Sequence, residues 1–247
     1  MADRHGCRRL PVTSVGWAER SGADQSARLT RENLNELAGA YARSSRANGA
    51  IVKLWGPSQY GLAEVVRDQT DVCLKVYAKD PSRVLQDANN ERRISEGGYA
   101  TRQLEELIQN AVDAASKGGG HIEVLLTPEA LYVANDGAPF DEDGVRSVMA
   151  SDVSTKDDVG IGKVGIGFRS VLAVSQNPKV LSRSVSFAFD KAWAEATLQG
   201  EGYSFDAYPT MRLAKTIDAD SEAEKDPNLP PLMTWASTIV VAPLATD

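Results

Sequence analysis

An amphipathic helix that ends at three consecutive glycines constrains the fold of this chain more than any other feature. At about 100° per residue its apolar positions fall on one broad face: Leu104, Leu107, Ile108, Ala111, Val112 and Ala115. The pattern predicts a helix from about Thr101 to Lys117, which Gly118–Gly120 terminate. Such a helix must pack against a core, and two alternating apolar segments, 121–127 and 130–135, follow it as a predicted β-hairpin.

The rest of the chain divides into segments of different character. Residues 1–28 are polar and aperiodic and are predicted as a flexible tail. A helix is expected over about 30–43, and another over the polar stretch 82–96. Residues 51–56 (IVKLWG) are consistent with a short strand or an apolar anchor, and the alternation in 72–78 (VCLKVYA) with a strand.

Beyond the hairpin, a turn at Asp136-Gly137 leads into a polar segment and a glycine cluster at 160–167. A short helix is expected from Phe168, and strands near 179–184, 185–189 and 238–242. The acidic, proline-bearing stretch 214–232 has no periodicity and is interpreted as a long loop, either functional or disordered. We expect three parts: the tail 1–28, a mainly helical extension 29–100, and a core of 101–247.

Composition excludes several functional classes. No apolar run reaches the roughly 18–20 residues that a membrane span needs. Cys7 and Cys73 are too few for a disulfide framework or a four-cysteine zinc site, and they fit a cytoplasmic protein. With only His5 and His121, Ser-His-Asp chemistry and a two-histidine metal site lack their residues. The net charge of -7 makes nucleic acid an unfavourable partner.

The polar face of the 101–117 helix carries the first candidate site. Gln103, Glu106, Asn110 and Asp113 form a stripe, in which Glu106 and Asn110 are one turn apart and therefore neighbours. Asn110 can offer a hard oxygen to Mg²⁺, and Glu106 can orient and deprotonate a water for attack on phosphorus. A polar stripe of this kind, taken alone, more often marks a helix face that is simply solvated.

The glycine cluster is the second candidate. A dinucleotide-binding loop would follow an apolar strand, but residues 154–159 read STKDDV, and a Walker loop would need Ser or Thr where Val164 stands. Without side chains, the backbone amides of Gly160, Gly162, Gly165 and Gly167 can approach phosphate oxygens ahead of a helix N-terminus. The alternative is a merely flexible loop.

Three motifs in this order resemble those of the GHKL ATPases, the group that includes DNA gyrase, heat-shock-90 chaperones, sensor histidine kinases and MutL. The motifs are ELIQNAVDA (106–114), VANDGAPF (133–140) and GIGKVGIGF (160–168). Residues 77–114 and GIGFRSV are further similar to sacsin-type N-terminal ATPase domains. One departure stands out: the family's adenine-binding Asp falls at Asn135, with Asp136 one step later, so either residue could read the base.

The resemblance implies an α+β fold, namely a two-layer sandwich whose mixed, mostly antiparallel sheet is covered on one face by helices. It implies Mg²⁺-dependent binding of ATP and slow hydrolysis driving a chaperone-like conformational switch, with Glu106 catalytic and Asn110 on magnesium. The nucleotide-binding residues that it implies are Asn110, Asp113, Asn135, Asp136, Gly137, Ser154, Thr155, Lys156, Gly160, Gly162, Lys163, Val164, Gly165, Ile166, Gly167, Phe168 and Thr238.

Several of these residues can also be explained without a role in binding. Ser154–Lys156 are equally expected of a solvated loop, and Thr238 of strand propensity alone. The expected partners are ATP or ADP, C-terminal domains of a longer chain, and a second copy in an ATP-dependent homodimer, without a membrane. Two other functions stay open: a nucleotide-sensing interaction module with little hydrolysis, and a nucleic-acid-processing ATPase.

Overall fold

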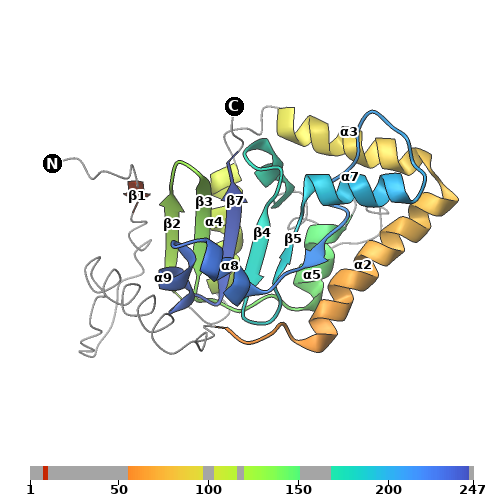
Figure 1. Ribbon diagram of the computed structural model, residues 1–247. Coiled ribbons are helices and arrows are strands. Elements are labelled where there is room, and N and C mark those ends of the chain that lie inside the picture. The colour runs from red at the N-terminus through yellow and green to blue at the C-terminus, as the bar shows by residue number, and fades with distance from the viewer. Residues whose placement is uncertain (1–7, 11–54, 97–102, 116–119, 151–167, 245–247) are drawn as a thin grey trace, which may run out of the picture.

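A twisted antiparallel sheet forms the centre of the computed structural model, which describes residues 8–10, 55–96, 103–115, 120–150 and 168–244. The sheet has seven strands in the order β1-β2-β3-β7-β4-β5-β6, and each neighbouring pair is antiparallel (Figure 1). The strands are β1 (Arg8–Leu10), β2 (Ile122–Leu126), β3 (Ala130–Asn135), β4 (Lys179–Ser182), β5 (Phe187–Ala188), β6 (Lys215–Thr216) and β7 (Thr238–Pro243).

Helices interrupt and flank these strands, so the fold is α+β, as the family resemblance implies. The helices are α2 (Tyr60–Lys79), α3 (Ser82–Glu96), α4 (Gln103–Ala115), α5 (Glu142–Met149), α7 (Lys191–Gly200), α8 (Ala219–Lys225) and α9 (Leu229–Met233), with a 3₁₀ turn η1 (Ser170–Ala173). Asp141, Asp190 and Asp218 cap α5, α7 and α8 by accepting a hydrogen bond from a backbone N–H three residues on. No helix in these ranges combines the length and apolarity needed to cross a bilayer.

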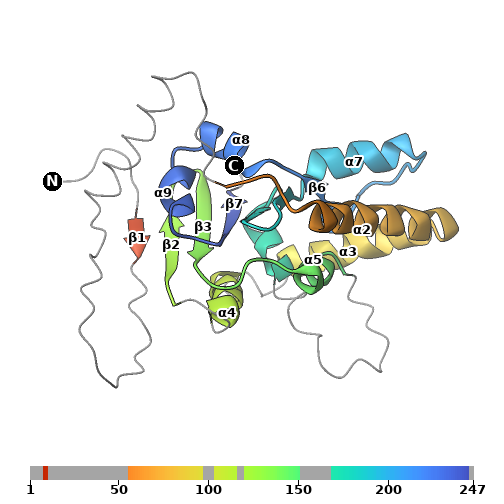
Figure 2. The same ribbon diagram turned by 90° about the horizontal axis from the view of Figure 1, so that it is seen from below.

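The sheet buries both of its faces, because apolar residues occupy both sides of its central strands. Val133 and Val240 contribute to one core with α2, α4 and α5, whereas Tyr132 and Ile239 contribute to a second core with α8 and α9. Figure 2 shows α4 on one side of the sheet and α8 and α9 on the other. The expectation of helices on one face only is therefore wrong, since the central strands alternate between two apolar faces rather than between an apolar and a solvated one.

The segment 214–232 explains this difference. Interpreted as a long loop, it instead forms β6, α8 and α9. Ala219, Ala223, Leu229 and Leu232 are buried in the second core. Pro230 and Pro231 stand in the first turn of α9, where the missing N–H groups cost no helical hydrogen bond. The few apolar residues among the acidic ones are enough to pack α8 and α9 against the sheet.

The stretch 72–78 is also corrected, because it lies within α2 rather than in a strand. The alternating Val72 and Val76 are 51% and 39% exposed, whereas Cys73 and Tyr77, one turn apart, are buried. The helical spacing of the buried residues thus decides the structure. In the segment 51–56, Trp55 is a buried anchor whose Nε1 donates to the Met233 carbonyl at 2.9 Å.

The helix over 82–96 is confirmed as α3, the helix near 101–117 as α4, and the hairpin as β2 and β3. The helix expected near 30–43 lies outside the described residues, and of the expected tail 1–28 only β1 is described, paired with β2. The boundaries between the three expected parts stay predictions.

A buried polar cluster fastens α2 and α3 to the core. The Tyr77 hydroxyl donates to Asp87 Oδ2 at 2.8 Å, and Arg212 Nε donates to the same oxygen at 3.2 Å. The carboxylate of Glu91 accepts the backbone N–H groups of Thr210 at 2.6 Å and Met211 at 2.8 Å. Burial nevertheless raises the pKa of Glu91 to about 7, against the lowering effect of these two donors and of the Arg169 charge.

This pKa predicts a pH-dependent stability. The ordinary pKa of Glu, 4.5, lies below the folded value of about 7, so between these values the folded state binds the extra proton and stability falls as pH rises. We expect the free energy of unfolding to fall by up to about 3 kcal/mol between pH 4.5 and 8 because Glu91 loses its proton over this range. Urea denaturation across this range should show a flatter pH profile for Glu91→Gln than for the wild type.

The matched control is Glu96→Gln, which changes an exposed glutamate at the end of the same helix. It should keep the wild-type pH profile. Parallel profiles for the wild type and Glu91→Gln would contradict the assignment of this pH dependence to Glu91.

Candidate functional site

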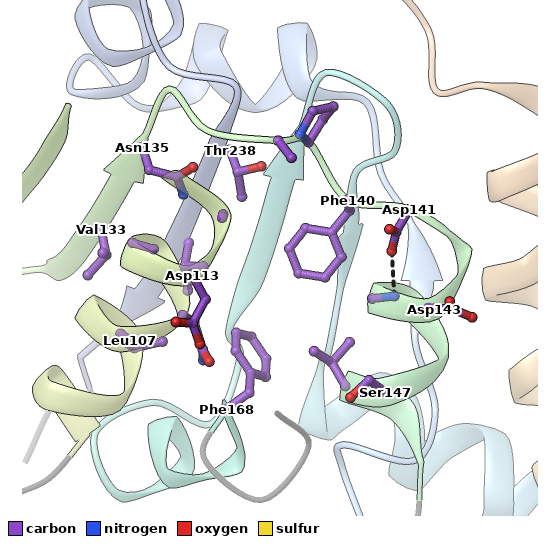
Figure 3. Close-up of a pocket in the computed structure, with 18 residues that line it drawn as sticks. Leu107, Asp113, Val133, Asn135, Phe140, Asp141, Asp143, Ser147, Phe168 and Thr238 are labelled. Carbon is purple, nitrogen blue, oxygen red and sulfur yellow. Dashed lines mark hydrogen bonds between the residues drawn. The ribbon is translucent and has the colours of Figure 1, made fainter. Parts of the chain in front are cut away.

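A cavity of about 360 Å³ opens on the α4 side of the sheet, between α4, α5 and strands β3 and β7 (Figure 3). This volume lies within the range of small-molecule sites. Its lining residues are Leu107, Asn110, Ala111, Asp113, Ala114, Val133, Asn135, Ala138, Pro139, Phe140, Asp141, Asp143, Gly144, Ser147, Val148, Phe168, Thr238 and Val240.

Five of the sequence-predicted nucleotide-binding residues line this cavity: Asn110, Asp113, Asn135, Phe168 and Thr238. They come from α4, β3, the residues just before η1, and β7, which are separated along the chain. The fold thus brings the first and second motifs, and the last residue of the third, to one cavity. Their contact with a nucleotide stays a prediction.

Sheet register places Asn135 beside Thr238. The two residues are paired across β3 and β7, and the backbone N–H of Ser237 donates to the Asn135 carbonyl at 2.8 Å. Asn135 is 4% exposed, and its Oδ1 accepts the N–H of Gly137 at 3.0 Å. This hydrogen bond to the residue two positions on is an Asx turn, which holds the side chain at the end of the strand.

Asp136 faces a different part of the molecule. Its Oδ1 accepts the backbone N–H groups of Gly120 and His121, each at 2.8 Å, and so closes the base of the β2–β3 hairpin. Asp136 does not belong to the lining that the described residues form. Of the two candidates for contact with a base, Asn135 is therefore the one at the cavity.

Hydroxyl groups of Ser182 and Ser184 hold the cavity wall formed at Phe140 against the sheet. Thr238 Oγ1 and Ser182 Oγ share a hydrogen bond of 3.1 Å, and Ser182 Oγ accepts the N–H of Phe140 at 3.1 Å. Ser184 Oγ donates to the Phe140 carbonyl at 2.5 Å. The segment that leads from β3 to α5 is thereby fixed above β4, and Figure 3 shows the Phe140 ring across the cavity from Asn135.

Glu106 is half-buried on α4, one turn before Asn110, but it is not among the described lining residues. Ser154, Thr155 and Lys156 lie outside the described residues, as does the glycine motif Gly160, Gly162, Lys163, Val164, Gly165, Ile166 and Gly167. Phe168, the next residue, is buried at the cavity.

The charges on the described lining are all negative. Asp113, Asp141 and Asp143 line the cavity, and no Lys, Arg or His belongs to the part of the lining that is described. Asp141 is engaged as the cap of α5, accepting Gly144 N–H at 2.8 Å. Within the described ranges, no three His, Cys, Asp or Glu side chains are grouped to hold a metal ion. A polyanionic ligand would need cations or N–H donors from elsewhere.

The α5 side of the cavity was missed by sequence reasoning, which left residues 138–159 as a polar segment. Phe140, Asp141, Asp143 and Ser147 belong to this side. A signal was available: Asp141 is a good N-cap, and Glu142 and Asp143 in the next positions favour a helix start. The helix is short, and without a long apolar period it was not predicted.

Comparison with known proteins gives one partial relative. An alignment 91 residues long, which covers 34% of this chain, is 38% identical to Protein NO VEIN of Arabidopsis thaliana. The match covers 3% of the length of that protein. No family model matches the chain.

At Gly137 the turn after β3 lies directly against the backbone of α4. A Cβ at this position would lie 2.4 Å from the Ala114 carbonyl carbon and 2.5 Å from Ala115 N. The neighbouring Ala138 N–H donates to the Ala114 carbonyl at 3.1 Å, so the turn sits directly on the C-terminal end of α4. Only glycine allows this contact between two backbones.

Gly137→Ala should therefore lower the free energy of unfolding by at least about 2 kcal/mol, because α4 backbone must move away from the turn. Gly61→Ala is the matched control, since its Cβ would have nothing within 4 Å. That helical change should be neutral or stabilise by up to about 1 kcal/mol. Chemical denaturation measures both, and equal stabilities of Gly137→Ala and the wild type would refute the close approach.

Proposed function

We propose that this cavity binds a nucleoside triphosphate and that the chain is an ATP-binding domain of the GHKL type. One observation carries the proposal: Asn110 and Asn135, from two separate motifs of that resemblance, and Thr238, a single residue that it also implies, line one cavity. Each of these residues, taken alone, can be explained without a ligand, as part of a solvated helix face, a turn or an ordinary strand. Residues with only those roles would not need to line one pocket.

The architecture shares with this type an antiparallel sheet that helices cover on the α4 face. An antiparallel sheet carries α4 across one face, and the cavity lies between that helix and strands β3 and β7. The helices α8 and α9 on the second face are additions to that expectation. The partial similarity to Protein NO VEIN supports a relationship to that protein and leaves the activity as our proposal.

The two ends of the cavity suit the two ends of a nucleotide. Leu107, Val133 and Val240 offer apolar contacts to a base, whose edge would meet Asn135 and Thr238. The Asn110 amide oxygen is a suitable hard ligand, and Mg²⁺ bound there would neutralise phosphate charge. The amides of the glycine segment 160–167, together with Lys156 and Lys163, would supply the positive potential that the acidic described lining lacks.

Hydrolysis would require Glu106 to position and deprotonate a water at the terminal phosphate. Glu106 lies one helical turn from Asn110, which keeps it near the phosphate end of such a complex. We propose slow turnover, with ordering of the glycine segment around ATP and its release after hydrolysis acting as a conformational switch.

A second candidate function, nucleotide sensing with little hydrolysis, is favoured by one specific observation. Glu106 is not part of the lining that the described residues form. A bound nucleotide without measurable phosphate release would support sensing over catalysis.

Three variants of α4 separate binding from turnover. Calorimetric titration with Mg·ATP should show at least about tenfold weaker binding for Asn110→Ala, equivalent to about 1.4 kcal/mol, with little remaining magnesium dependence. Glu106→Ala should bind like the wild type but release phosphate roughly a hundredfold more slowly, because general-base assistance is lost.

Glu105→Ala is the control, since Glu105 is exposed on the same helix and does not line the cavity. It should change neither quantity. The ATP site would be rejected if neither the wild type nor Glu105→Ala bound Mg·ATP, and the role of Glu106 would be rejected by wild-type turnover in Glu106→Ala.

A further inference from the structure

Arg212 contacts two helices that are far apart in the sequence. Its Nε donates to Asp87 Oδ2 on α3 at 3.2 Å, and its Nη1 donates to the carbonyl of Met149, the last residue of α5. The side chains of Arg212 and Asp87 are only 14% and 8% exposed. A planar guanidinium, which has several donors in a rigid arrangement, suits a contact with two partners. Arg212 therefore connects α3 directly to α5.

The backbone next to Arg212 is itself held by α3. Glu91, one turn after Asp87, accepts the N–H groups of Thr210 at 2.6 Å and Met211 at 2.8 Å. Moving this segment away from α3 would break two buried hydrogen bonds to one carboxyl group. The guanidinium consequently reaches α5 from a backbone that α3 keeps in place.

The C-terminal end of α5 gains two kinds of support from Arg212. The helix has only eight residues, a length that is marginal without tertiary contacts. The last carbonyl groups of a helix lack partners within it, and a positive charge at that end interacts favourably with the helix dipole. Arg212 supplies both the hydrogen-bond donor and the charge.

The position of α5 matters because this helix forms one wall of the cavity. Gly144, Ser147 and Val148 of α5 line the cavity, and Figure 3 shows this helix across the cavity from α4. Ser147 and Val148 directly precede Met149, whose carbonyl Arg212 binds. If this end of α5 were loosened, a ligand would have to order it on binding, at a cost in affinity.

From these contacts, and resting on the proposed function, we propose that Arg212 is a positioning residue for nucleotide binding. Arg212 and Asp87 do not belong to the lining that the described residues form. Arg212 holds the α5 wall in place relative to α3, and the affinity for nucleotide depends on this contact. Asp87 thereby contributes to binding through Arg212.

Arg212→Met tests this role, because methionine is also long and unbranched but has no N–H donor and no charge. Hydrogen–deuterium exchange of the whole chain should be at least about tenfold faster in peptides that cover α5, because the helix opens more often, and unchanged in α4. Calorimetric titration should show at least about fivefold weaker binding of Mg·ATP, because the wall must be ordered by the ligand.

Asp87→Asn tests whether α3 acts through the same contact. The asparagine keeps an oxygen that can accept from Arg212 but removes the charge, so Mg·ATP binding should weaken at least about threefold. The double variant Asp87→Asn/Arg212→Met should bind no more weakly than Arg212→Met alone, because both changes disrupt one interaction. Losses of affinity that multiply in the double variant would overturn the inference.

Tyr77→Phe is the matched control within the same buried cluster. It removes the 2.8 Å hydrogen bond from the Tyr77 hydroxyl to Asp87 Oδ2 but leaves both contacts of Arg212. We expect a lower Tm with wild-type exchange in α5 and wild-type affinity for Mg·ATP. A loss of affinity equal to that of Arg212→Met would indicate general destabilisation of the cluster and would overturn the positioning role.

Wild-type exchange of α5 in Arg212→Met, or wild-type affinity for Mg·ATP in that variant, would overturn the inference and leave the proposed function standing. Absence of Mg·ATP binding by the wild type would overturn the proposed function and the inference together. Should Arg212→Met fail to fold, as judged by circular dichroism, the double variant takes its place, because it leaves no buried carboxylate without its cation. The same outcomes then decide.

Discussion

The antiparallel pairing of β3 with β7 decides where the candidate functional residues of this chain lie. It joins two strands that are far apart in sequence and sets Asn135 opposite Thr238. The same pairing places Val133 and Val240 on the face that α4 covers, and Tyr132 and Ile239 on the face that α8 and α9 cover. A register slip of one residue would exchange these two sets, so the cavity and both cores depend on one ladder of hydrogen bonds.

The close approach of a turn to a helix completes the cavity. Gly137 lies against the backbone of Ala114, and the Asn135 amide receives the Gly137 N–H in the same turn. The turn conformation that packs the end of β3 against the C-terminal end of α4 thus also orients the Asn135 side chain at the cavity edge. One turn therefore determines both the packing of the hairpin against α4 and the orientation of the Asn135 amide. The sequence Asn-Asp-Gly at 135–137 thus predicts more than a turn.

The strongly periodic parts of the chain could be predicted from sequence, and the weakly periodic parts could not. The amphipathic pattern of α4 and the alternation in β2 and β3 placed Asn110 and Asn135 on elements that meet. By contrast, the alternation of Val72 and Val76 suggested a strand where helical burial of Cys73 and Tyr77 prevails. Short helices such as α5 and α8 depend on caps and on tertiary burial, which a single sequence shows only weakly. Residues 154–167, on which the phosphate end of the hypothesis depends, stay a sequence-based prediction.

The most direct measurement is a crystal structure of the chain with Mg²⁺ and a non-hydrolysable ATP analogue. We expect the base to lie between α4 and strands β3 and β7, with its edge at Asn135 and Thr238 and its phosphates on the side of Asn110. A nucleotide bound elsewhere on the chain, with this cavity empty, would contradict the proposed site.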